Sequence, residues 1–418
     1  MSQGFLSDFS NILDIPSNIY AFNPSIAHWK DNLYLCSYRE FVRYPNLFQK
    51  GTTDTGIPYD YTTDKFTDLN HPWFGKCRHL RWNYKAGGGF DNTRIDIIQI
   101  DTEKEEVNLI PSRMYVENKV VQNIVGQDAR LLQINDNKFL LSCNNYFNGV
   151  IIKDQTNCPN SCQLISTRII EVLDNYQIII HPETVLCPNI SSIIEKNWSF
   201  SLINRGKPEA YIAFSYGLYP IHEVFNVSIE QNQLICRDIT PIIKSREDNI
   251  FSRLVKFYGE KLFFVSVSTP TVEIEPNIFL GVGHIKFIHT QITLFPNPSP
   301  LYNFYEMYKS SKTMHEIYIY MMFFYAFNID NGDIITCSNM FLPPTTGTLC
   351  FPSGLTRKNN SDLIILSYGE NDDKCMFITY TIQELKNLLD AQNIVNKGAN
   401  EVLFYMMSEE VKDIVMTT

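Results

Sequence analysis

The sequence lacks the features that mark several common classes of protein. It has no run rich in lysine and arginine, and its formal net charge is −10, so neither nucleic acid nor an anionic membrane is expected as the main partner. No apolar run is long enough to span a bilayer. The first ten residues have neither the basic nor the apolar region of a signal peptide. We therefore expect a cytoplasmic protein without a membrane span, and nothing in the sequence indicates its oligomeric state.

The ten cysteines lack the spacing of a disulfide framework or of a zinc site. Cys36, Cys143 and Cys350 lie in or beside apolar runs, which is typical of reduced, buried thiols. Cys158 and Cys162 form a single C-x₃-C pair without a partner pair, and an ordinary loop is the more common use of such a spacing. No His-x-His or His-x₃-His spacing occurs. No metal site and no resident cofactor are predicted.

Strand-forming residues are abundant. Of the 418 residues, 44% are hydrophobic and 19% charged, as in globular proteins, and 23 are tyrosine and 28 phenylalanine. Both aromatic types favour β-strands, and tyrosine also lines sugar-binding clefts. The frequent Asn, Ile and Tyr fit an AT-rich genome, such as that of some large DNA viruses.

One short unit recurs five times: a polar cluster, an apolar strand, a polar turn, a second apolar strand and another polar cluster. The copies span residues 23–40, 126–143, 196–217, 248–270 and 351–372. A repeated strand hairpin is typical of radial β architecture. We therefore predict an all-β fold, a single five-bladed β-propeller. In a hairpin the first strand starts where the second one ends, so all five polar clusters are expected on one side of the molecule.

No low-complexity linker divides the chain, so residues 1–418 are predicted to form one domain, with an N-terminal arm at 1–20. Two long inserts, at about 41–122 and before 351, are candidate binding loops, but residues 94–111 and 316–337 within them are better explained as outer strands of blades. A short helix and tail are expected at about 381–418, with Thr381 as N-cap and Glu384 completing a capping box.

Two acidic residues are candidates for chemistry. Asp128 stands directly before an apolar strand, two residues from Arg130, and allows two interpretations: a structural ion pair or a catalytic acid tuned by a dry cleft. Asp372 lies just past the predicted strand 363–367 of another copy of the unit, in an acidic stretch that could also be a solvated loop. Two carboxylates brought together from distant units are what glycosidic chemistry requires.

Basic and imidazole groups occupy comparable places in the other copies. They are Arg39, Arg130, Lys196, His222, His284 and His315. A cluster of this kind would suit phosphate or a sugar diphosphate. A lone histidine is more often structural, but His284 follows Gly-Val-Gly, where a close approach of the backbone is allowed.

Several motifs, in this order, carry a family resemblance. They are Asn23-Pro-Ser-Ile with Tyr38-Arg39, Gln127-Asp128-Ala129-Arg130, Lys196-Asn197-Trp198, Leu280-Gly-Val-Gly-His284, and Phe351-Pro-Ser-Gly354 with Tyr368-Gly-Glu-Asn-Asp372. The sequence resembles the five-bladed β-propeller glycosidase superfamily, most closely the mannoside phosphorylases of glycoside hydrolase family 130 and the related β-mannosyltransferases.

The resemblance implies a phosphorylase- or glycosyltransferase-like enzyme that acts on the glycosidic bonds of a mannoside or related hexoside. Asp128 would donate the proton through a substrate hydroxyl, Asp372 would bind the sugar ring, and inorganic phosphate or a nucleotide-sugar donor would be the co-substrate. Further substrate-binding positions would be Asn23, Arg39, Arg130, Lys196, Asn197, Trp198, His222, His284, His315, Tyr368 and Glu370.

The sequence departs from the family pattern at residues 267–270, where Val-Ser-Thr-Pro replaces Arg-Gly-Gly-Thr and one phosphate-site arginine is missing. This departure weakens phosphorolysis and leaves hydrolysis, transfer from an activated sugar, or glycan binding. The alternative to an enzyme is therefore a non-catalytic glycan-binding or scaffold propeller.

Overall fold

The computed structural model describes most strands of the chain. The described residues are 4–13, 19–42, 92–147, 162–186, 197–235, 241–246, 249, 251, 264–288, 318–338, 340–341, 343, 350–370 and 374–391, with short strands at 51–52, 58–60, 65–66 and 405–406. No helix in these ranges is long and apolar enough to cross a membrane.

The described strands form five sheets of four or more strands, here called sheets 1 to 5, and one small sheet. Sheet 1 contains β2 (Ile19–Lys30), β3 (Leu33–Val42), β7 (Asn92–Asp101), β8 (Glu106–Ile110) and β11 (Ile124–Val125). Sheet 2 contains β9 (Arg113–Val116), β10 (Lys119–Val121), β12 (Gln127–Gln133), β13 (Lys138–Phe147), β14 (Cys162–Val172), β15 (Gln177–Ile180) and β16 (Thr184–Val185). Sheet 3 contains β17 (Ser199–Ile203), β18 (Tyr211–Ser215), β19 (Glu223–Glu230), β20 (Gln233–Ile235) and β21 (Ile243–Lys244).

Sheets 4 and 5 complete the set. Sheet 4 contains β22 (Phe264–Val267), β23 (Val272–Glu275), β24 (Ile278–Ile288), β25 (Tyr318–Asn328), β26 (Ile334–Cys337), β27 (Met340–Phe341) and β31 (Tyr405–Met406). Sheet 5 contains β28 (Cys350–Arg357), β29 (Leu363–Glu370), β30 (Lys374–Thr381) and the N-terminal β1 (Leu6–Asp8). The small sheet contains β4 (Gly51–Thr52), β5 (Pro58–Asp60) and β6 (Lys65–Phe66). A short 3₁₀ helix, η1 (Ser10–Ile12), follows β1.

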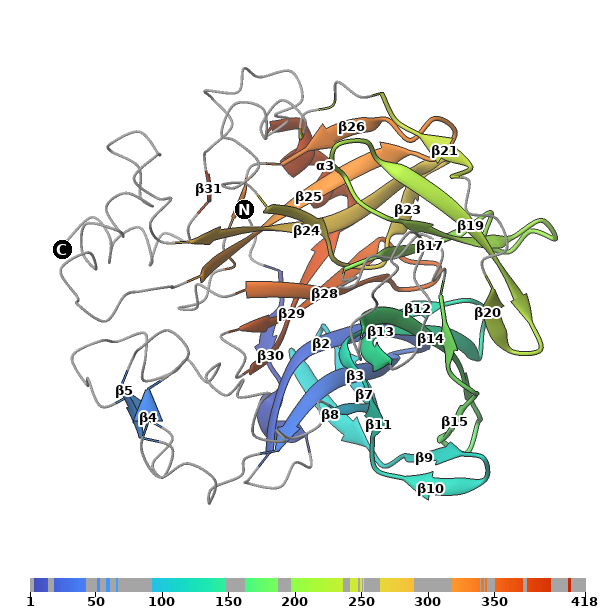
Figure 1. Cartoon of the computed structure of the whole chain (residues 1–418), viewed down its shortest axis with the longest axis vertical. Helices are drawn as coiled ribbons and strands as arrows, with labels where there is room; N and C mark the ends of the chain where they lie inside the picture. The colour runs from blue at the N-terminus through green and yellow to red at the C-terminus, as the bar shows by residue number, and fades with distance from the viewer. Residues whose placement is uncertain are drawn as a thin grey trace.

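The sheets are arranged around a common centre like the blades of a propeller, and the red-orange sheet 5 lies between the gold sheet 4 and the blue sheet 1 (Figure 1). The N-terminal β1 pairs with β30, so the start of the chain adds a strand to a sheet whose other strands lie between residues 350 and 381. The fold is thus all-β and propeller-like, as predicted. The count of five blades remains a prediction at this point.

Each sheet buries both of its faces because successive side chains of a strand point in opposite directions. In β25, Phe323 packs toward sheet 3, whereas the next residue, Phe324, packs toward sheet 5. In β2, Ile26 packs toward sheet 5 and Ala27 toward sheet 2. Five hydrophobic clusters result, one between each pair of neighbouring sheets, in the cyclic order 1–2, 2–3, 3–4, 4–5 and 5–1.

In the four repeat units whose first strand is described, β2, β12, β17 and β28, this strand forms the inner edge of its sheet, where backbone groups lack a partner strand. Hydroxyl groups of the neighbouring sheet satisfy some of these groups. Ser25 Oγ accepts a hydrogen bond from Leu131 N at 2.9 Å, and Ser367 Oγ accepts one from Ile26 N at 3.1 Å. These bonds connect sheets 1 and 2 and sheets 5 and 1, so they fix the inner strands relative to each other.

The predicted hairpins at 23–40, 126–143, 196–217 and 351–372 are observed as β2–β3, β12–β13, β17–β18 and β28–β29. The fourth copy, 248–270, lies partly outside the described residues, and its second strand is observed as β22. The outer-strand interpretation of 94–111 and 316–337 is confirmed by β7, β8, β25 and β26. The cysteines at 36, 143 and 350 are buried, as expected.

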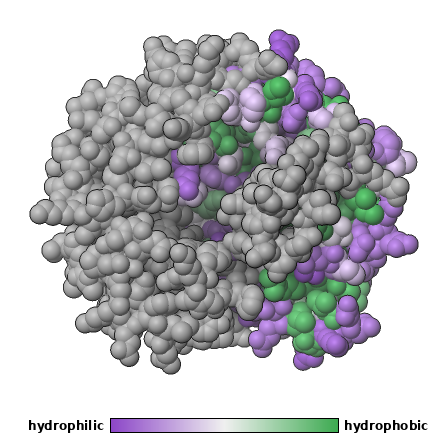
Figure 2. All heavy atoms as spheres, in the orientation of Figure 1, coloured by the Kyte–Doolittle hydropathy of each residue, from purple (hydrophilic) through white to green (hydrophobic). Residues whose placement is uncertain are grey.

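The predicted C-terminal helix is α3 (Ile382–Ala391), and its capping box forms as expected. Glu384 N donates to Thr381 Oγ1 at 3.1 Å, and Thr381 N donates to Glu384 Oε2 at 2.7 Å. Leu385 and Leu389 on the apolar face of the helix are buried against sheets 4 and 5. In the described part of the face shown in Figure 2, hydrophilic and hydrophobic residues are intermingled.

Candidate functional site

Three non-glycine residues at the entrances of inner strands have left-handed backbones. The φ angles are +51° at Asn23, +49° at Asp128 and +64° at Asn197. In β2 and β12 the residue lies at a β-bulge, where the pairing register shifts between Phe22 and Ser25 and between Gln127 and Arg130. Bulges re-aim side chains, and left-handed backbone strain collects at functional sites. The repeat unit therefore places a re-aimed polar residue at the same end of three sheets.

The carboxylate of Asp128 is held by two residues of sheet 1. Asn23 Nδ2 donates to Asp128 Oδ1 at 2.9 Å, and Arg39 Nη1 lies 3.0 Å from the same oxygen. Asp128 is only 8% exposed. The ion pair of the structural interpretation therefore forms, but across two sheets with Arg39 and not with the sequence neighbour Arg130. The carboxylate and the guanidinium thus form an ion pair that connects sheets 1 and 2.

Arg130 connects three segments. Its Nη1 donates to the backbone carbonyl of Asp128 at 2.8 Å, its Nη2 donates to Asn197 Oδ1 at 2.7 Å, and its Nε donates to the carbonyl of Ser268. The guanidinium also lies 5.6 Å from the ring centre of Phe351. Burial lowers the pKa of Arg130 to about 10, and the charge of Asp128 partly offsets this. Arg130 is therefore a buried cation at neutral pH.

His284 lies beside Arg130. Its Nδ1 is hydrogen bonded to the hydroxyl of Ser268, and its ring lies 5.1 Å from that of Phe351 and 5.4 Å from that of Tyr320. Burial, and then the positive charges of Arg130 and Lys286, lower the pKa of His284 to about 3. A neutral imidazole at this position can donate or accept one hydrogen bond without adding charge.

Tyr368 and Glu370 border this cluster from β29. Gly369 between them packs so closely on Asn23 that a Cβ atom there would lie 2.0 Å from Asn23 Oδ1. Tyr368 is buried among the apolar residues between sheets 4 and 5. The carboxylate of Glu370 is 1% exposed and lies 3.7 Å from Lys374 Nζ.

We define the Asp128 cluster as Asn23, Arg39, Asp128, Arg130, Asn197 and His284. The structure thus brings together six of the predicted site residues, from sheets 1 to 4. Trp198 has a different environment, since its ring stacks on Phe214 at 4.6 Å inside the core between sheets 2 and 3.

His222 is not brought to the Asp128 cluster. Its Nδ1 donates to the carbonyl of Gly332 at 2.9 Å, and its Nε2 is hydrogen bonded to Ser215 Oγ at 2.8 Å. Burial lowers the pKa of His222 to about 4. With both ring nitrogens bonded to protein, His222 connects sheets 3 and 4. Lys196, His315 and Asp372 lie outside the described residues, so the expected meeting of Asp128 with Asp372 stays a prediction.

Three residues of the site were missed by sequence reasoning. Ser268 lies in the segment that departs from the family pattern, yet its carbonyl binds Arg130 and its hydroxyl binds His284. Phe351 and Tyr320 supply the aromatic surroundings of His284. Phe351 was visible within a motif, but Ser268 and Tyr320 gave no signal, because their roles depend on contacts between sheets.

A second polar network on β3 and β7 was also missed. Tyr38 Oη donates to Asp96 Oδ2 at 2.5 Å, Arg94 Nε lies 3.1 Å from the same oxygen, and Asn123 Nδ2 donates to Glu40 Oε2 at 3.1 Å. Burial raises the pKa of Glu40. Alternating charges within an otherwise apolar strand, Arg94 and Asp96, were the available signal.

The Asp128 cluster places hydrogen-bond donors and acceptors around one carboxylate. They are two guanidinium groups, two amides and a neutral imidazole. Such a set can bind hydroxyl groups and an anion. Among the described residues, no group of three or more histidine, cysteine or acidic side chains is placed to hold a metal ion.

No protein-family model matches the sequence, and no curated protein matches it significantly. Several solved structures are similar. A β-1,2-mannobiose phosphorylase from Listeria innocua aligns with 94% of this chain and 100% of its own, at 12% identity and a TM-score of 0.48. MPT-1, a GDP-Man-dependent mannosyltransferase from Leishmania mexicana, aligns with 92% of this chain and 89% of its own, at 9% identity and a TM-score of 0.46. MPT-4, a mannose phosphorylase from the same organism, aligns over 88% and 86%, at 9% identity and a TM-score of 0.44. At these values the likeness assigns no activity to this chain.

Proposed function

We propose that the protein is a carbohydrate-active enzyme that acts on glycosidic bonds, phosphorylase- or glycosyltransferase-like, on a mannoside or related hexoside. The observation that carries the proposal is the position of Asp128, a carboxylate that a strained backbone and a bulge direct into a group of cations and amides. The sequence motifs of the mannoside phosphorylases and mannosyltransferases fall on these same residues.

A carboxyl group that donates a proton in one direction of a reaction accepts it in the reverse direction. Asp128, which the family resemblance gives as the proton donor of phosphorolysis, is therefore our candidate for the proton acceptor in the direction of transfer. We assign it the role of a base that takes the proton of an acceptor hydroxyl, directly or through a sugar hydroxyl, while that oxygen bonds to the anomeric carbon. The bond from that carbon to a phosphate-bearing leaving group breaks, and the leaving group keeps the electron pair.

Arg130 and His284 would lie near the leaving group, the first as a buried cation and the second as a neutral hydrogen-bonding group. Transfer from an activated sugar fits the missing arginine at residues 267–270 better than phosphorolysis does, because Ser268 occupies that segment and already binds Arg130. The donor would be a sugar phosphate or a nucleotide sugar.

The proposal includes one domain with five blades. Two observations support that number: each of the five larger sheets shares a hydrophobic cluster with both of its neighbours, and the repeat units correspond to one sheet each.

The experiment compares wild type with Asp128→Asn, which keeps the size of the side chain and removes the charge. Mannose 1-phosphate and a nucleotide-activated mannose serve as donors with a panel of mannosides as acceptors, and release of phosphate or nucleoside diphosphate is measured. We expect Asp128→Asn to lower the rate by about 10²- to 10⁴-fold, the contribution of general acid–base catalysis. Equal rates in the two proteins would remove Asp128 from the mechanism.

The second candidate is a glycan-binding propeller without catalysis. The observation that favours it is the buried ion pair of Asp128, which could serve only to fix sheets 1 and 2. It predicts saturable binding of a mannoside without turnover of any donor, and a lower thermal stability of Asp128→Asn as the main effect of the substitution.

A further inference from the structure

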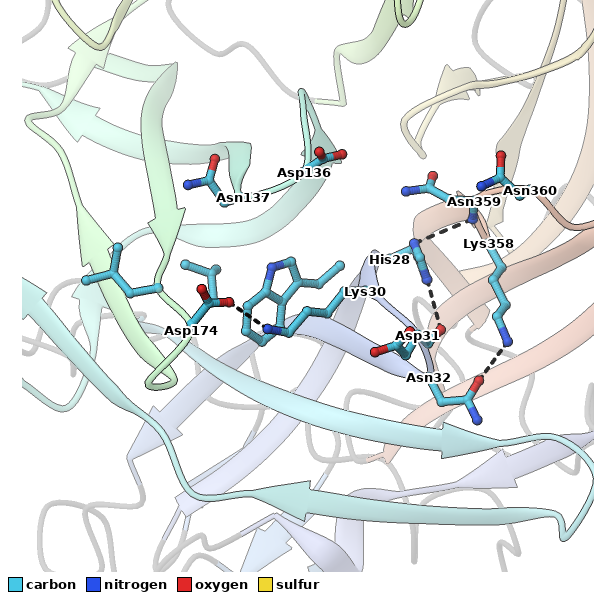
Figure 3. A pocket seen from close by; sticks show the side chains of 13 residues that line it. His28, Lys30, Asp31, Asn32, Asp136, Asn137, Asp174, Lys358, Asn359 and Asn360 are labelled. Atoms are coloured by element: carbon cyan, nitrogen blue, oxygen red, sulfur yellow. Dashed lines mark hydrogen bonds and ion pairs between the residues drawn. The ribbon is translucent and has the colours of Figure 1, made fainter.

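A cavity of about 770 Å³ lies at the end of the sheets opposite to the Asp128 cluster (Figure 3). Its wall is built by four hairpin turns, those of β2–β3, β12–β13, β14–β15 and β28–β29. Asp31 and Asp136 each follow a residue of the Asp128 cluster, Asn23 and Asp128, by eight positions along the chain. An extended strand of that length spans about 25 Å, so the two sites lie far apart.

We propose that this cavity, here called the turn-side pocket, is a second binding site for a neutral, hydroxyl-rich ligand, an oligosaccharide. The proposal goes beyond the reaction at the Asp128 cluster and does not depend on it.

The chemistry of the wall carries the assignment. Carboxylate and amide side chains dominate it: Asp31, Asn32, Asp136, Asn137, Asp174, Asn359 and Asn360. The carboxylates accept hydrogen bonds in pairs, and the amides both accept and donate them, as adjacent sugar hydroxyls require. Within the described part of the chain, Asp31 and Asp136 have no ion-pair partner and the side chains of Asn359 and Asn360 have no recorded hydrogen bond. Figure 3 shows Asp136 and Asn360 on opposite hairpins across the cavity.

The charges of the pocket favour a neutral ligand. Three aspartates face two lysines, and Lys30 Nζ already lies 2.8 Å from Asp174 Oδ1. Lys358 Nζ donates to Asn32 Oδ1 at 2.6 Å. With no large excess of either sign, an anion or a polycation gains little here, whereas hydroxyl groups can bind to the remaining polar atoms.

The wall is also held in place before any ligand arrives. The buried ring of His28 bridges two turns: its Nε2 is hydrogen bonded to the carbonyl of Asp31 at 3.1 Å, and its Nδ1 accepts from Asn359 N at 3.5 Å. Trp29 packs beneath Lys30, whose Nζ lies 4.2 Å from the ring centre. A preformed wall lowers the entropic cost of binding, and the volume is within the range of about 300 to 1,000 Å³ found for small-molecule sites.

Isothermal titration calorimetry of the full chain with neutral trisaccharides, among them mannotriose, tests the proposal. The double variant Asp136→Ala/Asn360→Gly removes one polar group from each side of the pocket, and glycine keeps the left-handed backbone of residue 360, where φ is +56°. We expect it to weaken binding by about tenfold or more, since two hydrogen-bonding groups are lost.

Asn118→Gly is the matched control, because Asn118 is also an exposed turn residue with a left-handed backbone, at φ +65°, and does not line the pocket. It should bind as wild type does. Binding at the turn-side pocket should also persist in Asp128→Asn, even where that substitution changes binding at the Asp128 cluster, and this separates the two sites. The proposal would be overturned if no trisaccharide binds wild type, if the double variant binds unchanged, or if only Asp128→Asn abolishes binding. A retained melting temperature of the double variant verifies that it is folded.

Discussion

Arg130 makes hydrogen bonds to three separate segments, on β12, before β17 and after β22. Asp128, two residues away, takes its own cation from β3. At the scale of single residues, the chemistry of this protein therefore depends on partners from neighbouring sheets. Burial between sheets then changes the acidity of these groups, as the lowered pKa values of Arg130 and His284 illustrate.

The buried His222 should make stability depend on pH. Its pKa falls from the usual 6.5 to about 4 in the folded protein because it is buried. Between these values the unfolded chain binds the proton and the folded one does not, so the stabilisation is complete above pH 6.5 and is lost as the pH falls toward 4. The expected loss is about 1.4 kcal/mol for each pH unit from this residue.

Urea unfolding of wild type and His222→Gln at pH 7, 6 and 5 measures this contribution. The free energy of unfolding of wild type should fall more steeply with decreasing pH than that of the variant. The difference in slope should correspond to one additional proton bound by the unfolded wild-type chain. Parallel curves would show that His222 does not cause the acid sensitivity.

At the scale of elements, the inner strands carry the site. The bulges of β2 and β12 turn Asn23 and Asp128 toward each other, and β28 has a register shift at the corresponding place, between Pro352 and Gly354. The other end of each hairpin forms the turn-side pocket. The same hairpins thus contribute to two sites, and a substitution in a turn can alter the turn-side pocket without altering the Asp128 cluster.

Gly369 tests the contact between β29 and the bulge of β2. In Gly369→Ala the added methyl group would lie 2.0 Å from Asn23 Oδ1 and 2.8 Å from Asn23 N, so the bulge must move. We expect a loss of about 1–3 kcal/mol in the free energy of unfolding, the usual cost of overpacking, together with lower activity.

Gly217→Ala is the control for this substitution, because the nearest atom to a Cβ there is 3.6 Å away, an ordinary contact. Thermal unfolding and the donor assay are applied to both variants. An unchanged activity of Gly369→Ala would mean that the position of Asn23 does not matter for the site.

At the scale of the whole molecule, the N-terminal segment joins sheet 5. β1 pairs with β30 in the register Leu6 to Ile378, and Phe9 and Leu13 enter the cluster between sheets 5 and 1. Because the start of the chain pairs with a strand close to its other end and packs between sheets 5 and 1, loss of this segment should affect the stability of the entire molecule.

Phe9→Ala measures this closure. The side chain is 1% exposed in the cluster between sheets 5 and 1, and its truncation should cost about 3–5 kcal/mol in the free energy of unfolding. Ile229→Ala, at a side chain that is 42% exposed, should change it by no more than about 0.5 kcal/mol. A small effect of Phe9→Ala would show that the segment is not needed to hold the sheets together.

Local features of this protein could be predicted from the sequence because they depend on neighbours in the chain. The alternation of apolar residues determined the hairpins, and Thr381 with Glu384 determined the start of α3. The repeat unit even indicated which residues share one end of the molecule, and Asn23, Arg39 and Asp128 do meet there.

The pairing of partners was decided only by the tertiary structure. Spacing suggested Arg130 as the cation for Asp128, but Arg39 occupies that position, and Arg130 instead binds the carbonyl of Ser268. His222, which the sequence placed beside the substrate, bridges two sheets. The physical reason is that these contacts cross between sheets: they depend on strand register, on bulges and on the packing of the cores, none of which follows from the order of residues along one strand.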